Sequence, residues 1–169
     1  EKVILNVSRH VACKGLDTLL RGFARVCRDF PEWRLVQIGA GGETGALKQL
    51  AASLGIEDQV VWLGAQPHEQ VRDWMRRASI YAQASQQDEA GQTEAFGIVL
   101  LEAAASGLPV IATRSGGMPE AVVEGETGFM FPERGDSELS NLLLTLMDQP
   151  ERRLQMGRAG RQYALRFDI

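Results

Sequence analysis

The chain has 169 residues and is 44% apolar, 24% charged and 7% aromatic, proportions of an ordinary globular domain that exclude disordered, collagen-like and coiled-coil proteins. Its 18 Lys and Arg against 22 Asp and Glu give a net charge of −4, and no basic run exceeds a pair, which argues against binding along a nucleic-acid backbone. No stretch reaches the roughly 18 consecutive apolar residues of a membrane span, and no signal peptide opens the chain. We therefore expect a cytoplasmic protein in which Cys13 and Cys27 are reduced thiols.

Short apolar runs recur along the chain and are separated by segments of helical periodicity. Because the runs are nearly continuous, they are typical of strands covered on both faces, as in a parallel sheet. The order predicts an α/β fold, a Rossmann-like doubly wound parallel sheet whose ligand site lies at the carboxyl ends of the strands. The expected strands comprise residues 3–7, 35–38, 60–63, 80–84 and 109–113.

The last third of the chain departs from this alternation. After the fifth strand we expect a glycine-rich turn at 115–117, a short helix, a hairpin-like turn at 125–128 and two helices at 136–148 and 150–166. No repeat or linker divides the chain, so we expect one domain. The chain lacks an initiator Met and ends within a helical pattern, which indicates a piece of a longer protein.

The loop after the first strand, Ser8 to Gly15, carries two cations. Arg9 offers a planar guanidinium and Lys14 a compact ammonium, and both would lie at the carboxyl edge of the sheet. Together they suit the two phosphates of a nucleoside diphosphate. Basic residues are also common on surfaces that bind nothing, so a purely solvent-exposed role stays open for both.

The second loop, residues 39–45, is similar to the glycine-rich fingerprint of dinucleotide-binding proteins. Thr44 stands where the third glycine is needed, and the next strand lacks the carboxylate that would hold a ribose. A nicotinamide cofactor is therefore disfavoured. The glycines still allow the backbone to approach a nucleotide closely, because no Cβ blocks it.

The most informative stretch runs from Thr93 to Gly107. Between Ala95 and Ala105 every residue is apolar or glycine except Glu102, which shares a helical stripe with Ile98. Burying an unpaired carboxylate is costly, so Glu102 requires an Arg, backbone donors or ligand hydroxyls as its partner. A salt bridge to another helix is the alternative to ligand binding.

Glu94 precedes the same predicted helix, whose first turn begins at Gly97 and Ile98. Free N–H groups there, together with the helix dipole, favour an anion such as a phosphate. A carboxylate at Glu94 would repel a diphosphate but would accept hydrogen bonds from a sugar. The alternative is an acidic residue that only complements the helix dipole.

The pattern of these residues resembles a known family. Glu94 and Glu102 are separated by seven residues that include Phe96 and Gly97, similar to the E-x7-E motif of retaining nucleotide-sugar glycosyltransferases of the GT-B fold, family 4 in particular. Ala95 stands where the family usually has glycine, which adds a methyl group beside the sugar pocket. Further landmarks agree in order over nearly the whole chain: Ser8-Arg9, Lys14-Gly15, Leu63-Gly64, residues 107–112 and residues 116–120.

The resemblance implies that Arg9 and Lys14 are catalytic residues that hold the diphosphate and neutralise charge on the departing nucleotide. Backbone N–H groups of Phe96, Gly97 and Ile98 would assist them.

Glu94, the third catalytic residue implied by the resemblance, would meet the transferred sugar, and Glu102 would accept the ribose hydroxyls. The base would lie near Gly39 and Gln66. No D-x-D string is present, so we expect neither a metal nor another cofactor, the substrate being a UDP or GDP sugar.

The resemblance also implies that residues 1–169 are the C-terminal, donor-binding half of a GT-B fold, without the N-terminal acceptor domain. We expect a hexosyltransferase of polysaccharide biosynthesis that is inactive as this chain alone. Its partners would be a nucleotide-sugar donor and a glycan or lipid-linked acceptor, with association of the full-length enzyme with the inner face of the membrane left open. The alternatives are a nucleotide-sugar epimerase-like protein, although the loops lack its acid–base set, and a non-catalytic nucleotide-binding module.

Overall fold

Six parallel strands lie side by side at the centre of the computed structural model, which describes residues 1–94 and 96–167. Their order across the sheet is β3-β2-β1-β4-β5-β6, so the winding direction reverses between β1 and β4. An open parallel sheet leaves a crevice for ligands at such a switch point. The strands are β1 (Val3–Val7), β2 (Arg34–Ile38), β3 (Val60–Gly64), β4 (Ile80–Gln83), β5 (Val110–Thr113) and β6 (Gly128–Phe131).

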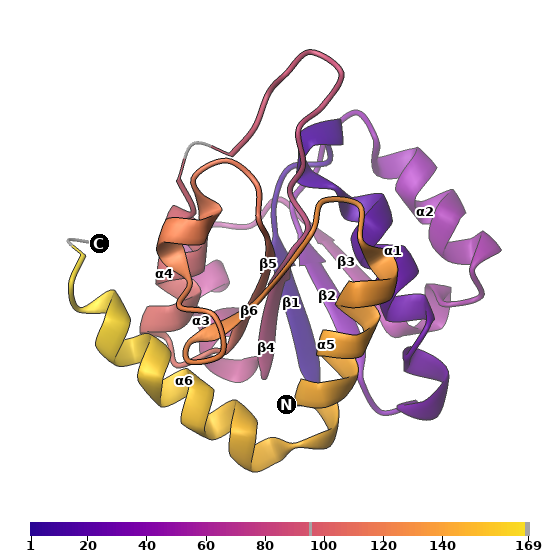
Figure 1. Ribbon diagram of the computed structural model, residues 1–169. Helices are drawn as coiled ribbons and strands as arrows, with labels where there is room; N and C mark the ends of the chain where they lie inside the picture. The colour runs from indigo at the N-terminus through magenta and orange to yellow at the C-terminus, as the bar shows by residue number, and fades with distance from the viewer. Residues whose placement is uncertain (95, 168–169) are drawn as a thin grey trace.

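Helices cover both faces of the sheet (Figure 1). Apolar residues of α1, α2 and α5 pack on one face, and those of α3 and α4 pack on the other. Helix α6 contacts both α4 and α5. The helices are α1 (Leu16–Ala24), α2 (Thr44–Ser53), α3 (His68–Arg77), α4 (Ile98–Ala105), α5 (Asp136–Asp148) and α6 (Pro150–Ala164), with 3-10 helices η1 (Ala12–Lys14), η2 (Cys27–Asp29), η3 (Glu57–Gln59) and η4 (Met118–Ala121).

The strands send alternate side chains into the two layers. In β1, Ile4 packs with α1 and α5, whereas Val3 and Leu5 belong to the layer of α3 and α4, and all three are buried. Both faces therefore need apolar residues, which is why the strands appear in the sequence as continuous apolar runs. The predicted Rossmann-like, doubly wound fold is confirmed.

All five expected strands are present, and their ends differ from the prediction by at most one residue. The sequence does not predict β6, whose four residues follow directly on the glycine turn. The expected turn is present, because the N–H of Gly125 donates to the carbonyl of Gly128 at 2.8 Å. It forms no hairpin, however, since the bridge between Glu124 and Gly128 is parallel and β6 pairs in parallel with β5. Gly128 permits this close pairing, because a Cβ there would overlap the carbonyl oxygen of Val110.

The two expected C-terminal helices are also present. Helix α5 has the predicted limits, and α6 ends at Ala164 instead of Arg166. Within the described residues, no helix combines the length and the apolar composition needed to cross a bilayer.

Candidate functional site

The loops after β1 and β4 meet at the switch point of the sheet. The first loop contains η1, and the second leads to α4 and rises beyond the ends of the strands (Figure 1). Gly15 brings them together, since a Cβ at this position would overlap the carbonyl oxygen of Ala84. Gln86 fastens them further, because its backbone N–H and its side-chain amide each donate to a carbonyl of η1 at 2.9 Å. The two loops thus form one continuous wall.

Lys14 and Glu94 form an ion pair on this wall, with 2.5 Å between Nζ and Oε2. Their side chains are only 15% and 18% exposed, so solvent screens the pair less than it screens a surface pair. Both residues are candidates in the sequence from separate motifs, and the structure brings them into contact. The ammonium has three N–H donors, so two remain for another acceptor.

Two side chains of the β4 segment also reach the Glu94 carboxylate. Gln83 Nε2 lies 3.4 Å and Ser85 Oγ 3.3 Å from Oε2 of Glu94. Neither residue is among those predicted from the sequence. The sequence does carry a signal for them: Gln83 and Ser85 are two positions apart in an otherwise apolar run, which places both side chains on one face of a strand.

The backbone of Glu94 is held by the glycine-rich turn after β5. Gly117 donates its N–H to the carbonyl of Glu94 at 2.9 Å. Gly116 has a φ of +54°, and a Cβ there would overlap the same carbonyl oxygen. The turn expected at 115–117 therefore has a specific role, which is to hold the Glu94 segment against the end of β5.

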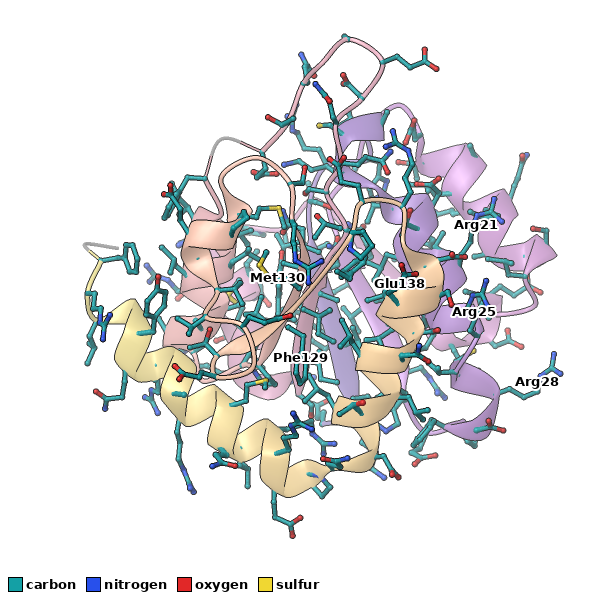
Figure 2. All side chains as sticks on the ribbon, viewed as in Figure 1. Arg21, Arg25, Arg28, Phe129, Met130 and Glu138 are labelled. Atoms are coloured by element: carbon teal, nitrogen blue, oxygen red, sulfur yellow. The ribbon has the colours of Figure 1, made fainter. Side chains whose placement is uncertain are left out.

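Arg9 is exposed beside this wall, and none of the hydrogen bonds or ion pairs among the described residues uses its side chain. Other cations of the same layer point elsewhere. Figure 2 shows Arg21, Arg25 and Arg28 projecting outward from α1 and the segment that follows it, and Arg25 lies 3.5 Å from Asp136. Arg9 and Lys14 are thus the cations that the β1 loop contributes at the carboxyl edge.

The loops after β2 and β3 complete the edge of the site. Gly39, with a φ of +138°, packs so closely on the β1 loop that a Cβ would overlap the carbonyl oxygen of Ser8. Its N–H donates to the carbonyl of Gly64 at 2.9 Å. Gln66 caps the end of β3 through Nε2, which donates to the carbonyl of Leu63 at 2.7 Å. This hydrogen bond uses one N–H of the Gln66 amide, so the amide oxygen and the backbone remain for a ligand.

A layer of buried polar side chains supports these loops from below. His10, which is uninformative in the sequence, is 2% exposed and lies 2.5 Å from Gln37 Oε1 and 2.6 Å from Thr44 Oγ1. Gln37 in turn donates to Asn6 Oδ1 and to the carbonyl of Ser8. This layer links β1, β2 and the glycine loop, so it fixes the loops on which Arg9 and Gly39 lie.

The start of α4 differs from the expectation in one respect. The N–H of Ile98 is not free, because it donates to the carbonyl of Phe96 at 2.9 Å. Gly97 lies just before the helix and is buried, and Phe96 packs near Phe167, with 6.0 Å between ring centroids. The tight turn from Phe96 to Ile98 thus uses one of the donors expected for a phosphate.

Glu102 faces an open groove and not the core. Ile98 and Ala105 line the same groove, which lies between α3 and α4 and has a volume of ≈ 730 Å³. The expectation of a buried carboxylate is wrong, because the side chain is 31% exposed. Among the ion pairs of the described residues it is matched only with His68, whose Nε2 lies 3.9 Å from Oε2 and is charged only when the imidazole is protonated. No Arg or Lys holds Glu102 in those pairs, so the carboxylate is accessible to a ligand.

Three arginines also line this groove, and none of them is among the residues predicted from the sequence. Its arginines come from two helices that are far apart in the chain, and only the fold brings them together. They are Arg72, Arg76 and Arg161.

Comparison with known proteins identifies the family. The chain matches the family model "Glycosyl transferases group 1" over residues 1–163. A GDP-mannose-dependent alpha-(1-6)-phosphatidylinositol monomannoside mannosyltransferase of Mycolicibacterium smegmatis is 35% identical over 96% of this chain and 43% of its own length. The gpi3 subunit of phosphatidylinositol N-acetylglucosaminyltransferase from Schizosaccharomyces pombe is 39% identical over 86% of this chain and 31% of its own. The chain thus spans less than half the length of these curated relatives.

Solved structures agree with this assignment. Anabaena Alr3699/HepE in complex with UDP and glucose superposes with a TM-score of 0.88 at 27% identity, over 99% of this chain and 45% of that one. The C-terminal domain of the glycosyl transferase group 1 protein LpcC from Francisella tularensis gives 0.86 at 24% identity, over 98% and 85% of the two chains, which shows a shared fold. The fold is that of the C-terminal half of a GT-B protein, and the chain belongs to the group 1 glycosyltransferases.

Proposed function

We propose that this chain is the donor-binding domain of a retaining glycosyltransferase, which binds a nucleoside diphosphate hexose for transfer to a glycan or lipid-linked acceptor. One observation carries the proposal: Lys14 and Glu94 converge at the switch point of the sheet, and Arg9 is exposed in the same loop as Lys14. A cation and a carboxylate side by side match a donor whose phosphates and sugar hydroxyls are adjacent.

In this proposal Arg9 and Lys14 bind the diphosphate and are catalytic residues. As the bond from the sugar to the diphosphate breaks, negative charge grows on the departing oxygen, and fixed cations stabilise it. Lys14 can take part without releasing Glu94, because the pair uses one of its three N–H donors. No metal is assigned to this step, so a chelator should leave donor binding unchanged.

The carboxylates have separate tasks. Glu94 accepts hydrogen bonds from hydroxyls of the transferred sugar and is the third catalytic residue. Glu102, which lines the groove beside α3, accepts the ribose hydroxyls. Gly39 and the backbone at Gln66 lie along the base.

The relatives support this choice of ligand. One curated relative uses GDP-mannose, and the Anabaena protein was crystallised with UDP and with UDP-glucose. We therefore propose a UDP or GDP sugar as the donor. The names of two curated relatives give phosphatidylinositol or its mannoside as the acceptor, which supports a lipid-linked acceptor. We propose on that basis that the full-length enzyme associates with the inner face of the membrane.

The experiment is calorimetric titration of the purified chain with UDP, GDP, UDP-glucose, GDP-mannose and NAD. We expect one nucleoside diphosphate and its nucleotide sugar to bind with dissociation constants in the micromolar to millimolar range. The constants should be the same with and without EDTA. Binding of NAD alone would overturn the proposal in favour of a dinucleotide-binding protein, which includes the epimerase-like alternative.

A further inference from the structure

Three polar side chains on one face of the β4 segment have no part in the function proposed above. Tyr81, Gln83 and Ser85 alternate along the strand and are 0%, 1% and 0% exposed. Buried polar groups are costly unless they are hydrogen-bonded, so an unbroken buried row of them requires an explanation.

The direction of each hydrogen bond in this row follows from the Glu94 carboxylate at one end of it. The Glu94 carboxylate accepts only, so the group of Gln83 that lies 3.4 Å from it must be the NH₂ group. The amide oxygen of Gln83 then faces Tyr81. The hydroxyl of Tyr81 lies 2.9 Å from this oxygen and 3.2 Å from the carbonyl of Val7, and its single proton goes to the nearer acceptor, Gln83. The tyrosine oxygen accepts the N–H of Val7 at 3.2 Å, which anchors the row in β1.

Tyr81 is a permanent donor in this arrangement. Burial raises the pKa of the Tyr81 hydroxyl above its usual range, so the phenol keeps its proton at any physiological pH. The orientation of the Gln83 amide is therefore fixed from both sides, by a carboxylate at one end and a phenol at the other.

Ser85 completes the row. Its Oγ lies 3.1 Å from Gln83 Nε2, from which it accepts, and 3.3 Å from Glu94 Oε2, to which it donates. With Lys14 at 2.5 Å, one oxygen of Glu94, Oε2, takes all three of these donors. Among the described residues, no hydrogen bond is made to the second oxygen, Oε1.

We infer that Tyr81, Gln83 and Ser85 are positioning residues that hold Glu94 by Oε2 and leave Oε1 for hydroxyls of the donor sugar. The inference rests on the proposed function, because it requires that Glu94 meets the sugar. A carboxylate fixed on one side loses less rotamer freedom when a sugar binds, so the row favours nucleotide sugars over the bare nucleotide.

The experiment compares the affinity for a nucleotide sugar with that for its nucleoside diphosphate, using UDP-glucose with UDP and GDP-mannose with GDP. Gln83→Met removes both polar ends of the amide at nearly constant volume, and Tyr81→Phe removes only the hydroxyl. We expect each to weaken binding of the sugar nucleotide about 3- to 10-fold and that of the nucleoside diphosphate less than about 2-fold.

Two matched variants separate positioning from stability. Gln59→Met removes an amide that donates to three backbone carbonyls around η2, and Tyr163→Phe removes a hydroxyl that donates to the carbonyl of Glu120. Both should lower the melting temperature or leave it unchanged without altering the ratio of the two affinities. In a Glu94→Gln background, Gln83→Met should produce no further change in that ratio, because it acts through Glu94.

The outcomes are distinct. If the wild-type chain binds no nucleotide, the proposed function fails and the inference fails with it. If nucleotides bind and the Gln83 and Tyr81 variants lower stability but keep the wild-type ratio of affinities, the row is structural and the inference alone is overturned.

Discussion

Lys14 has two roles: it pairs with the largely buried Glu94, and it is proposed to bind the diphosphate of the donor. Its partner Glu94 is largely buried, so removing the ammonium leaves a carboxylate with only the neutral donors Gln83 and Ser85. Arg9 is exposed and has no such partner in the described contacts. The two cations therefore differ in what they contribute to stability, although both are proposed to bind the diphosphate.

Replacing Arg9 or Lys14 by alanine should weaken binding of a nucleoside diphosphate by about 1.5 to 3 kcal/mol while affecting the bare nucleoside far less, since the lost contact is with phosphate. Lys14→Ala should also lower the melting temperature, and Arg9→Ala should not. Calorimetry at low and high salt measures the binding, and raised salt should reproduce part of the Arg9 effect by screening. Arg28→Ala, which removes an outward-pointing cation (Figure 2), is the control. Equal losses for nucleoside and diphosphate would show that these residues act on the base or the fold.

Glu102 combines exposure with a carboxylate that no Lys or Arg holds in the described ion pairs. Glu102→Gln should weaken nucleotide binding by about 1 to 3 kcal/mol, because charge-assisted hydrogen bonds to ribose become neutral ones. The melting temperature should stay the same, and Glu69→Gln, a change on the exposed surface of α3, should alter neither quantity. Normal binding together with a melting point several degrees lower would assign Glu102 a structural role through His68.

The reactivity of the Cys27 thiol tests whether the core around it is closed to solvent in the folded chain. Loss of solvent raises the pKa of its thiol, so less of it is the reactive thiolate at any pH near neutrality. We expect iodoacetamide to label Cys27 at least about tenfold more slowly in the native chain than in urea. Mass spectrometry of digested samples gives the two rates, and equal rates would mean that this region opens freely in the folded state.

At the scale of elements, the glycine-rich turn after β5 carries the most specific constraint. It holds the carbonyl of Glu94 through the N–H of Gly117, and Gly116 leaves no space for a side chain. The turn therefore connects the end of β5 to Glu94, which precedes α4.

Gly116→Ala should destabilise the chain by more than the roughly 1 kcal/mol that a positive φ costs an alanine, because the added methyl group must also displace the Glu94 backbone. Donor binding should weaken with it. Gly125→Ala is the matched control, since Gly125 has a φ of +80° and no atom lies within 4 Å of the position that a Cβ would occupy there. Urea unfolding and calorimetry compare the two. Similar losses for both variants would mean that the contact with Glu94 relaxes without cost.

The elements themselves could be predicted where burial is two-sided. Strands such as Val3–Val7 appear as continuous apolar runs because both layers need apolar residues, and α5 was predictable from its periodicity. Strand β6 could not be predicted, since four residues beside a glycine turn carry too weak a pattern. A local pattern also gives no sign of which loop residues will meet.

The candidate site shows the same limit. Arg9, Lys14, Glu94 and Glu102 could be selected from motif spacing, but the ion pair between Lys14 and Glu94 joins residues 80 positions apart and depends on the order of strands in the sheet. The alternation of Tyr81 and Gln83 in an apolar strand was a usable signal that the motif-based prediction did not include. Arg72 and Arg76 of the groove beside Glu102 share α3, but Arg161 reaches the groove only through the packing of α6, which no local pattern reveals.

At the scale of the whole molecule, the sites proposed for phosphate, sugar and base lie at the carboxyl edge of a single sheet, and the site proposed for ribose lies in the groove between α3 and α4. Arg9 is exposed at this edge, and the groove beside Glu102 is open. Such an arrangement can bind a donor from one side, and every residue assigned above is proposed to bind the donor. The curated relatives are more than twice as long as the segment that this chain matches.

We therefore expect this chain to bind a nucleotide sugar but to transfer no sugar by itself. Transfer requires an acceptor held against the anomeric carbon, and without that positioning the reaction forfeits roughly 7 to 11 kcal/mol of proximity advantage. A second domain that closes over the edge would bind the acceptor and exclude water from the donor. The measurement is sugar transfer and donor hydrolysis by this chain and by a longer protein that contains it, at the same donor and acceptor concentrations. Comparable turnover by the two would mean that a complete active site lies within these 169 residues and that the donor-domain proposal is too narrow.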